Sequence, residues 1–152
     1  MQIRWARAED ASRLSTIAQL AKAHLGYHPE QLARWRDALT LTPASIDRLP
    51  SFVAVVDEII AGFCQLDNGT DPWVLEHLWV HPHYLRRGIG RALLSFAGFF
   101  AMERGMRALA IDAEPAAEAF YLACGAQRVA TTPAPIAGHP ERVRPQLLLF
   151  LR

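Results

Sequence analysis

A short glycine turn between a predicted strand and a predicted helix carries the clearest chemistry in the sequence. It reads Leu85-Arg86-Arg87-Gly88-Ile89-Gly90-Arg91. The first amides of a helix have no partner within the helix, and the helix dipole is positive at that end. Glycines let the backbone approach an anion without obstruction by a Cβ atom, and the three arginines add positive charge. The pattern therefore predicts a pyrophosphate site.

Two other phosphate-binding motifs do not fit this turn. A dinucleotide-binding fingerprint needs a third glycine at the position of Leu93, and a P-loop needs Gly-Lys-Ser/Thr after a longer loop. The structural alternative is a glycine turn that only joins a strand to a helix. The flanking arginines and the strand–turn–helix context favour anion binding.

Hydrophobic periodicity predicts the elements that must position the turn. Trp73 to Val80 is expected to be the preceding strand, Gly88 to Arg104 the following helix, and Arg107 to Ile111 the next strand. These three elements form a right-handed crossover unit. The other expected strands are 3–6, 51–56, 59–66, 127–131 and 146–151, and the other expected helical segments are 10–26, 29–36, 41–49 and 114–124. The order predicts a mixed α/β domain.

Composition limits the classes of protein to be considered. The chain has 152 residues, and we expect one domain, from residue 1 to residue 152. Hydrophobic residues make up 51% and charged residues 20%, which favours a packed core. A formal net charge of +1 with only short basic clusters argues against nucleic acid as a partner. No apolar run could span a bilayer and the first residues do not read as a signal peptide, so no membrane partner and a cytoplasmic location are expected.

Neither disulfide nor metal chemistry is indicated. Cys64 and Cys124 each lie in an apolar stretch, as core cysteines of a reducing compartment do, and no Cys/His cluster has zinc spacing. His81 and His83 flank a proline and lack nearby acidic partners, so we expect them to be exposed loop residues.

Two segments resemble motifs of the GNAT superfamily of N-acetyltransferases. Leu85 to Gly90 resembles the motif Gln/Arg-x-x-Gly-x-Gly/Ala, with Leu85 in place of the usual polar residue. Ile111 to Ala126 contains a stretch that resembles Asn/Asp-x-x-Ala-x-x-x-Tyr-x-x-x-Gly-Phe, with Glu114 where Asn or Asp is commoner and Ala126 where Phe is commoner. The order of elements also agrees. The resemblance implies a single mixed, mostly antiparallel sheet with a central splayed parallel strand pair, flanked by helices.

The resemblance also implies that acetyl-CoA is the cosubstrate. Its pyrophosphate would rest on the glycine turn and its pantetheine arm would run along the strand before the turn. The positions implied for cofactor binding are Leu78, Trp79, Val80, Arg86, Arg87, Gly88, Ile89, Gly90, Arg91, Glu114 and Ala117.

Direct attack of an amine on the thioester needs a base, which acts directly or through water, and an acid. The resemblance points to Glu76 as the base, the structural alternative being an exposed strand residue paired with an arginine. His77 is the rival, and strand alternation places it on the opposite face from Glu76 unless a bulge intervenes. Tyr121 matches the superfamily position of the general acid that protonates the leaving thiolate, the alternative being a core tyrosine.

The acceptor is expected to be a primary amine of a small molecule or a peptide. The segments that form the acceptor pocket in the superfamily carry mainly aromatic residues here: His24, Tyr27, His28, Trp35, Trp73 and Trp79. Homodimers are common in the superfamily, so a homodimer is also an expectation. A different class of protein, a GNAT-fold module that binds acyl-CoA without turnover, stays open, as does a nucleotide-binding protein.

Overall fold

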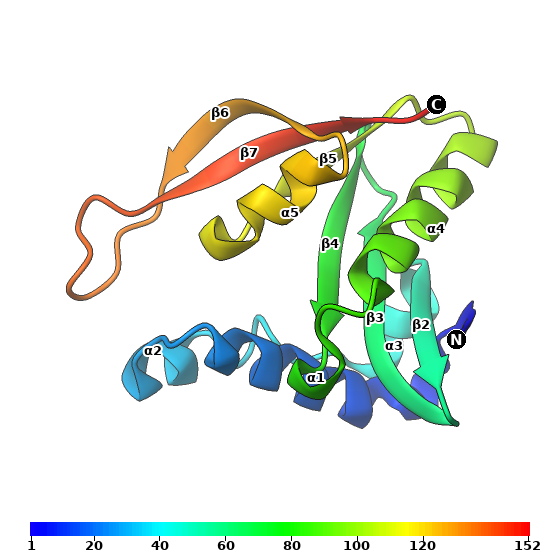
Figure 1. Cartoon of the computed structure of the whole chain (residues 1–152), viewed down its shortest axis with the longest axis horizontal. Coiled ribbons are helices and arrows are strands. Elements are labelled where there is room, and N and C mark those ends of the chain that lie inside the picture. The colour runs from blue at the N-terminus through cyan, green and yellow to red at the C-terminus, as the bar shows by residue number, and fades with distance from the viewer.

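One sheet of seven strands organises the molecule (Figure 1). The computed structural model describes residues 1–152. The strands are β1 (Gln2–Trp5), β2 (Ser51–Val56), β3 (Ile59–Asp67), β4 (Trp73–Val80), β5 (Ala108–Asp112), β6 (Gln127–Pro133) and β7 (Val143–Phe150). Their order is β1-β2-β3-β4-β5-β7-β6, and every neighbouring pair is antiparallel except β4 and β5. The predicted fold class is confirmed.

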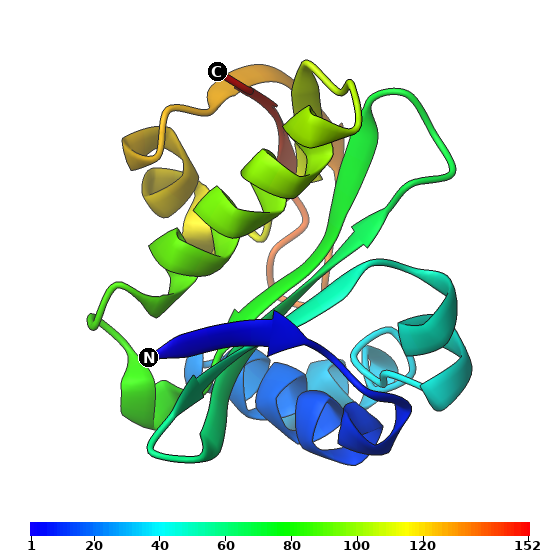
Figure 2. The ribbon, with the colours of Figure 1, turned by 90° about the vertical axis from the view of Figure 1, so that its right-hand side faces the viewer.

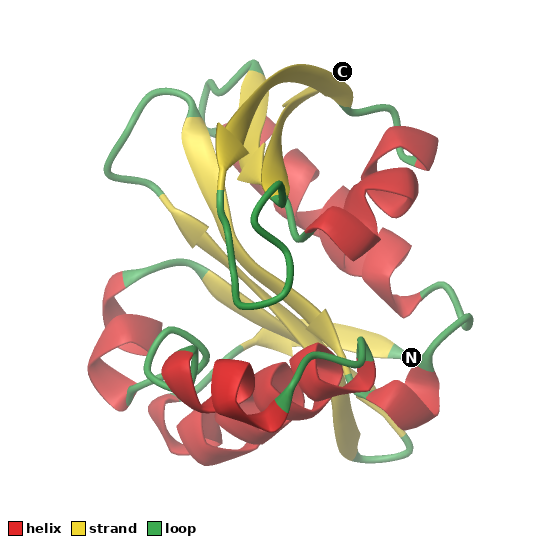
Figure 3. Ribbon diagram, turned by 90° about the vertical axis from the view of Figure 1, so that its left-hand side faces the viewer, coloured by secondary structure: helices red, strands yellow, loops and turns green.

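Helices cover both faces of the sheet (Figures 2 and 3). They are α1 (Ala11–His24), α2 (Pro29–Arg34), α3 (Pro43–Arg48), α4 (Ile89–Glu103) and α5 (Glu118–Ala123), with short 3₁₀ segments η1 (Ala8–Asp10), η2 (Pro82–Tyr84) and η3 (Pro115–Ala117). None of them combines the length and apolar character that a membrane crossing requires.

Two hydrophobic cores follow from this layering. On one face, Leu14 and Ile17 of α1 pack with Val53 and Phe63 of the sheet. On the other, α4 packs on the side chains of β2, β3 and β5, with Leu93 fully buried. Because strand side chains alternate between faces, each central strand contributes to both cores.

The C-terminal half of the chain differs in detail from the expected elements. The predicted helix 114–124 is divided into η3 and α5, because the Glu114 side chain accepts a hydrogen bond from Ala116 N and Pro115 occupies the first position of η3. The last strand begins at Val143 rather than at residue 146. On α4, Phe96 is 38% exposed and packs against Phe52 of β2, with ring centroids 4.9 Å apart.

The parallel pair is short, and this creates the site. β4 and β5 pair only at Trp73 with Leu109 and at Val74 with Ala110. Beyond these residues the strands diverge, as Figure 1 shows for β4 and the β5–β7 layer. The remaining length of β4 is therefore paired on one side only, with β3.

Candidate active site

A cleft of about 810 Å³ lies where β4 and β5 diverge. Its walls come from the end of α1, from β4, from the turn before α4, from the end of β5 and from the η3–α5 segment. The predicted site residues that line it are Glu76, Leu78, Trp79, Val80, Arg86, Gly88, Ile89, Gly90, Arg91, Glu114, Ala117 and Tyr121. Arg87 does not line it, and its guanidinium carbon lies 5.2 Å from the centroid of the Tyr84 ring.

The glycine turn has the backbone geometry of an anion site. The φ angle is −66° at Leu85, +60° at Arg86 and +78° at Gly88, which is the N-cap of α4. Leu85 itself is extended, with a ψ of 155°, so the feature of the turn that suits an anion is the N-terminus of α4, whose first N–H groups have no partner within the helix. Arg86 is strained at its positive φ because it carries a Cβ. At Gly90 an added Cβ would lie 3.4 Å from the Phe120 ring, so the glycine leaves room at the wall of the cleft.

The free side of β4 presents backbone groups from alternate residues. His81 N donates to Ala61 O at 2.8 Å, and the register pairs Trp79 with Phe63. Because peptide groups alternate in direction along an antiparallel pair, Trp79 turns its N–H and C=O toward β3. Leu78 and Val80 turn theirs toward the cleft. Trp79 therefore reaches the cleft with its side chain.

A bulge at Glu76 changes the alternation of side chains that was predicted for β4. Gln65 lies opposite His77 and Leu66 lies opposite Leu75, so Glu76 is the extra residue. Glu76 and His77 consequently both line the cleft, whereas strand alternation predicted that only one would. The residues before and after the bulge continue to bury side chains against α4, but with shifted parity: Leu75 before it and Leu78 after it.

Glu76 and His77 differ in their electrostatic state. Partial burial of the Glu76 carboxyl, together with the negative charges of Asp67 and Asp112, raises its pKa above the usual value. Burial lowers the pKa of His77 to about 4. The His77 Nδ1 accepts a hydrogen bond of 3.1 Å from Trp79 Nε1. His77 is therefore neutral at pH 7 with one ring nitrogen engaged.

Tyr121 is a core residue whose hydroxyl remains available. The side chain is only 7% exposed, and its hydroxyl makes no hydrogen bond within the protein. Because no fully buried side-chain polar atom lacks a partner, this hydroxyl must reach the surface of the cleft. Burial raises the pKa of Tyr121 well above its usual range. The phenol thus keeps its proton at neutral pH. Tyr121 is a core residue that also lines the cleft.

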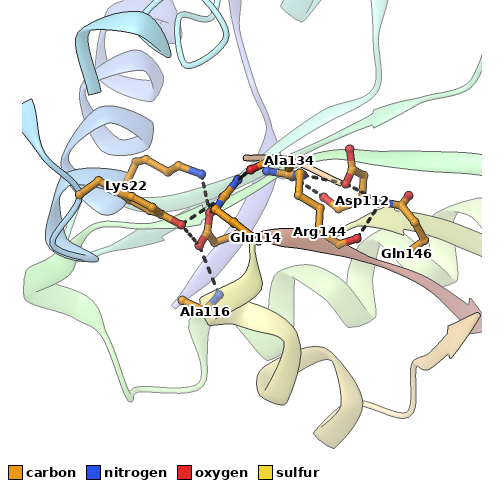
Figure 4. Close-up of polar contacts among 9 residues, drawn as sticks. Lys22, Asp112, Glu114, Ala116, Ala134, Arg144 and Gln146 are labelled. Atoms are coloured by element: carbon orange, nitrogen blue, oxygen red, sulfur yellow. Dashed lines mark hydrogen bonds and ion pairs between the residues drawn. The ribbon is translucent and has the colours of Figure 1, made fainter. Parts of the chain in front are cut away.

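Glu114 joins three segments of the chain in a buried ion cluster (Figure 4). It forms an ion pair with Lys22 of α1, accepts a hydrogen bond of 2.6 Å from the Tyr27 hydroxyl, and lies 3.6 Å from the Arg142 guanidinium. Burial alone would raise the pKa of Glu114, but the hydrogen bonds from Lys22 and Tyr27 outweigh it and the net pKa is lowered. Glu114 therefore stays a carboxylate, and its oxygens are already engaged.

A second ion pair lies beside the first. Arg144 Nε donates to Asp112 Oδ1 at 2.8 Å, and Gln146 Nε2 donates to the same oxygen at 2.8 Å (Figure 4). Burial alone would raise the pKa of Asp112, but Arg144 and Gln146 hold it below its usual value. Asp112 and Arg144 both line the cleft.

A family model for an acetyltransferase (GNAT) domain matches residues 48–125, just over half of the chain. The chain belongs to the GNAT acetyltransferase family. The matched segment contains the bulged strand, the glycine turn, α4 and Tyr121. The resemblance drawn from the two motifs is confirmed.

Solved structures show the same GNAT fold over nearly the whole chain. A GCN5-related N-acetyltransferase of Rhodopseudomonas palustris has a TM-score of 0.84 and 22% identity, over 99% of this chain and 95% of its own. The PaiA N-acetyltransferase of Thermoplasma acidophilum, in complex with coenzyme A, has a TM-score of 0.79 and 19% identity, over 97% and 96%. YncA of Salmonella typhimurium, solved with acetyl-CoA, has a TM-score of 0.72 and 19% identity, over 100% and 94%.

Three charged residues that line the cleft of this GNAT protein were not singled out from the sequence: Lys22, Asp112 and Arg144. Only Lys22 left a signal: it follows Leu14 and Ala18 at intervals of four on the buried face of α1, where a charge needs a partner. Of the predicted acceptor residues, His24 lines the cleft and Trp73 is in the core.

The remaining aromatic residues near the acceptor side have structural contacts. Tyr27 and Trp35 pack edge to face with ring centroids 4.8 Å apart. The Lys22 ammonium lies 4.2 Å from the Trp35 centroid. His28 caps α2 by accepting a hydrogen bond from Glu30 N. Tyr27 and Trp35 therefore pack around the ion cluster, whereas Trp79 lines the cleft.

Proposed function

We propose that this protein is an N-acetyltransferase that moves an acetyl group from acetyl-CoA to a primary amine. The observation that carries the proposal is that Tyr121, whose hydroxyl has no partner within the protein, lines the same cleft as the glycine turn and Glu76. Family membership supports the acetyltransferase class. The structural relatives solved with CoA and acetyl-CoA support the expected cosubstrate.

The residues of the cleft fit a CoA thioester. The unpaired first amides of α4, together with Arg86 and Arg91, suit the pyrophosphate. The free backbone groups of Leu78 and Val80 suit the amides of the pantetheine arm, which would add to β4 as an extra strand. Glu114 matches the superfamily motif in position, but Lys22 and Tyr27 occupy its oxygens, so we assign it to holding the wall of the cleft.

The proposed chemistry is a direct transfer. Glu76 accepts the proton that the amine releases, directly or through water, as the bond between the amine nitrogen and the acyl carbon forms. Tyr121 donates its proton to the sulfur that leaves as the C–S bond breaks. We assign to the Leu78 N–H the stabilisation of the negative charge that develops on the carbonyl oxygen.

The test compares the wild type with Tyr121→Phe and Glu76→Gln in an assay of thiol release from acetyl-CoA with a panel of amines. We expect each variant to lose about 100-fold in kcat with CoA binding retained. Glu103→Gln on the exposed end of α4 is the control for loss of a carboxylate, and we expect wild-type rates from it.

Two outcomes would overturn the proposal. Equal rates near background in all of these proteins, with acetyl-CoA binding intact, would identify a binding module without turnover. Thermal protection by ATP but not by CoA would identify a nucleotide-binding protein.

A further inference from the structure

A second hollow, the arginine groove, adjoins the cleft on its acceptor side. It has a volume of about 440 Å³ and lies between α2 and the loop that joins β6 to β7. Figures 1 and 3 show this loop reaching back toward α2. The lining residues are Gln31, Arg34, Trp35, Ala134, Pro135, Ile136, Ala137, Pro140, Arg142 and Arg144. Three of them are arginines and none is acidic. Arg142 and Arg144 are paired with carboxylates outside the groove, so the uncompensated positive charge is that of Arg34.

Arg144 connects the groove to the cleft, because it lines both. Its Nε and one Nη hydrogen bond to the Asp112 side chain and backbone, each at 2.8 Å. The other Nη has no partner within the protein. The Arg144 guanidinium is thus held in a fixed orientation, and the N–H groups of its other Nη are free to donate.

The other two arginines of the groove differ in burial and in their contacts. Arg142 is nearly buried and bonded to Ala134 O and to the Tyr27 hydroxyl, and its charge faces Glu114. Arg34, in the last turn of α2, is exposed and has neither an ion pair nor a hydrogen bond within the protein. Arg34 is therefore free to bind a ligand, on a wall that Arg142 keeps in place.

Carboxylates line the cleft but not the groove. Glu76 and Asp112 stand at the cleft end, and the carboxylate of Glu114 is matched by Lys22 and Arg142. Beyond Arg144, the only charged residues that line the groove are Arg34 and Arg142. This order of charges is complementary to a molecule that has an ammonium group at one end and an anion at the other.

We propose that the acceptor is an amine that also carries an anionic group, a carboxylate or a phosphate, bound by Arg34 and Arg144. Guanidinium forks match the oxygen geometry of both anions. The amine then lies at the Glu76 end of the cleft. This inference rests on the proposed transferase function and narrows its acceptor class.

The test measures kcat/KM with acceptor pairs that differ only in the anionic group. The carboxylate arm compares glycine, β-alanine, 4-aminobutyrate and 5-aminopentanoate with their amides, and the phosphate arm compares O-phosphoethanolamine with ethanolamine. We expect the best anionic acceptor to exceed its neutral partner by roughly 10-fold or more in kcat/KM. The arm with the larger preference identifies the anion.

Arg34→Gln then tests the groove itself. We expect it to raise KM for the anionic acceptor by about 10-fold, to leave kcat unchanged and to leave the neutral acceptors unaffected. Arg36→Gln is the matched control, because Arg36 is an exposed arginine two residues away that does not line the groove.

Failure of the two proposals is distinguishable. Transfer to neutral amines at rates equal to or above those of the anionic partners, or equal effects of Arg34→Gln and Arg36→Gln, would refute the arginine groove alone. Absence of transfer to every amine, with acetyl-CoA still bound, would refute the transferase proposal and this inference with it.

Discussion

Lys22 of α1 and Glu114 after β5 form a buried ion pair that ties the two walls of the cleft together. The residues are far apart in the chain, and each side chain is less than 10% exposed. A buried charge is costly unless it is paired. The pair therefore couples the position of α1, on one face of the sheet, to the segment that carries Tyr121.

Glu114→Gln removes the charge opposite Lys22, so we expect it to lower the free energy of unfolding by about 3 kcal/mol. Urea denaturation measures the loss. Lys22→Met combined with Glu114→Gln should lose clearly less than the sum of the two single variants, because the buried ammonium that Glu114→Gln leaves unpaired is removed and only the Arg142 charge stays without its carboxylate. Additive losses would contradict a direct coupling of the two residues.

The same pair predicts a pH dependence of stability. The pKa of Glu114 is lower in the folded protein than its usual value of 4.5. The unfolded chain therefore binds more protons below pH 4.5, and the stabilisation present above that pH is lost as the pH falls through the folded pKa. Unfolding curves between pH 3 and pH 6 should show a shallower dependence in Glu114→Gln than in the wild type. Parallel curves would be the contrary result.

Gly62 lets β3 lie close to β4 and α4. A Cβ at this position would be 2.9 Å from the Trp79 carbonyl oxygen and 3.3 Å from methyl groups of Ile89 and Leu93. We expect Gly62→Ala to destabilise the protein by roughly 1–3 kcal/mol, because a backbone atom cannot give way easily.

Gly98→Ala is the control for this packing prediction. Its Cβ would meet only a terminal methyl of Leu151, at 3.1 Å, and alanine favours the helix. We expect a melting temperature close to or above the wild type. A loss equal to that of Gly62→Ala would show that the approach to Trp79 is not the cause.

The β2–β3 turn offers a stabilising change away from the cleft. Asp57 and Glu58 have φ angles of +49° and +66°, the left-handed conformation that a two-residue hairpin turn requires. We expect Asp57→Asn with Glu58→Gly to raise the free energy of unfolding by about 1 kcal/mol. Glu58→Ala, which removes the charge but keeps the Cβ, should give no gain, and a gain from it would point to charge rather than backbone strain.

The raised pKa of Glu76 should appear in the rate. A base acts when ionised, so the ratio of kcat/KM between wild type and Glu76→Gln should rise with pH through the Glu76 pKa, which lies above 4.5. Because the same amine is used with both enzymes, its own protonation does not affect this ratio. Asp67→Asn removes one negative charge that raises this pKa, so it should move the rise to lower pH. A ratio that is constant with pH would exclude Glu76 as the base.

The sequence by itself determined the local elements of the site. The glycine turn, the strand before it and α4 follow from short-range rules, because a helix start, a tight turn and an apolar run depend on neighbouring residues. The second motif put Tyr121 on the segment after β5, and the structure has it in α5. Twelve of the predicted site residues line one cleft.

Only the tertiary structure decided the charged parts of the site. The bulge at Glu76 exists because β3 and β4 pair with one residue in excess, which no pattern within β4 predicts. The Lys22–Glu114 pair and the presence of Arg34 and Arg144 in one groove each bring together segments about a hundred residues apart. Such contacts depend on how the sheet and helices pack, whereas local propensity depends on adjacent residues, and so they could be read only from the folded chain.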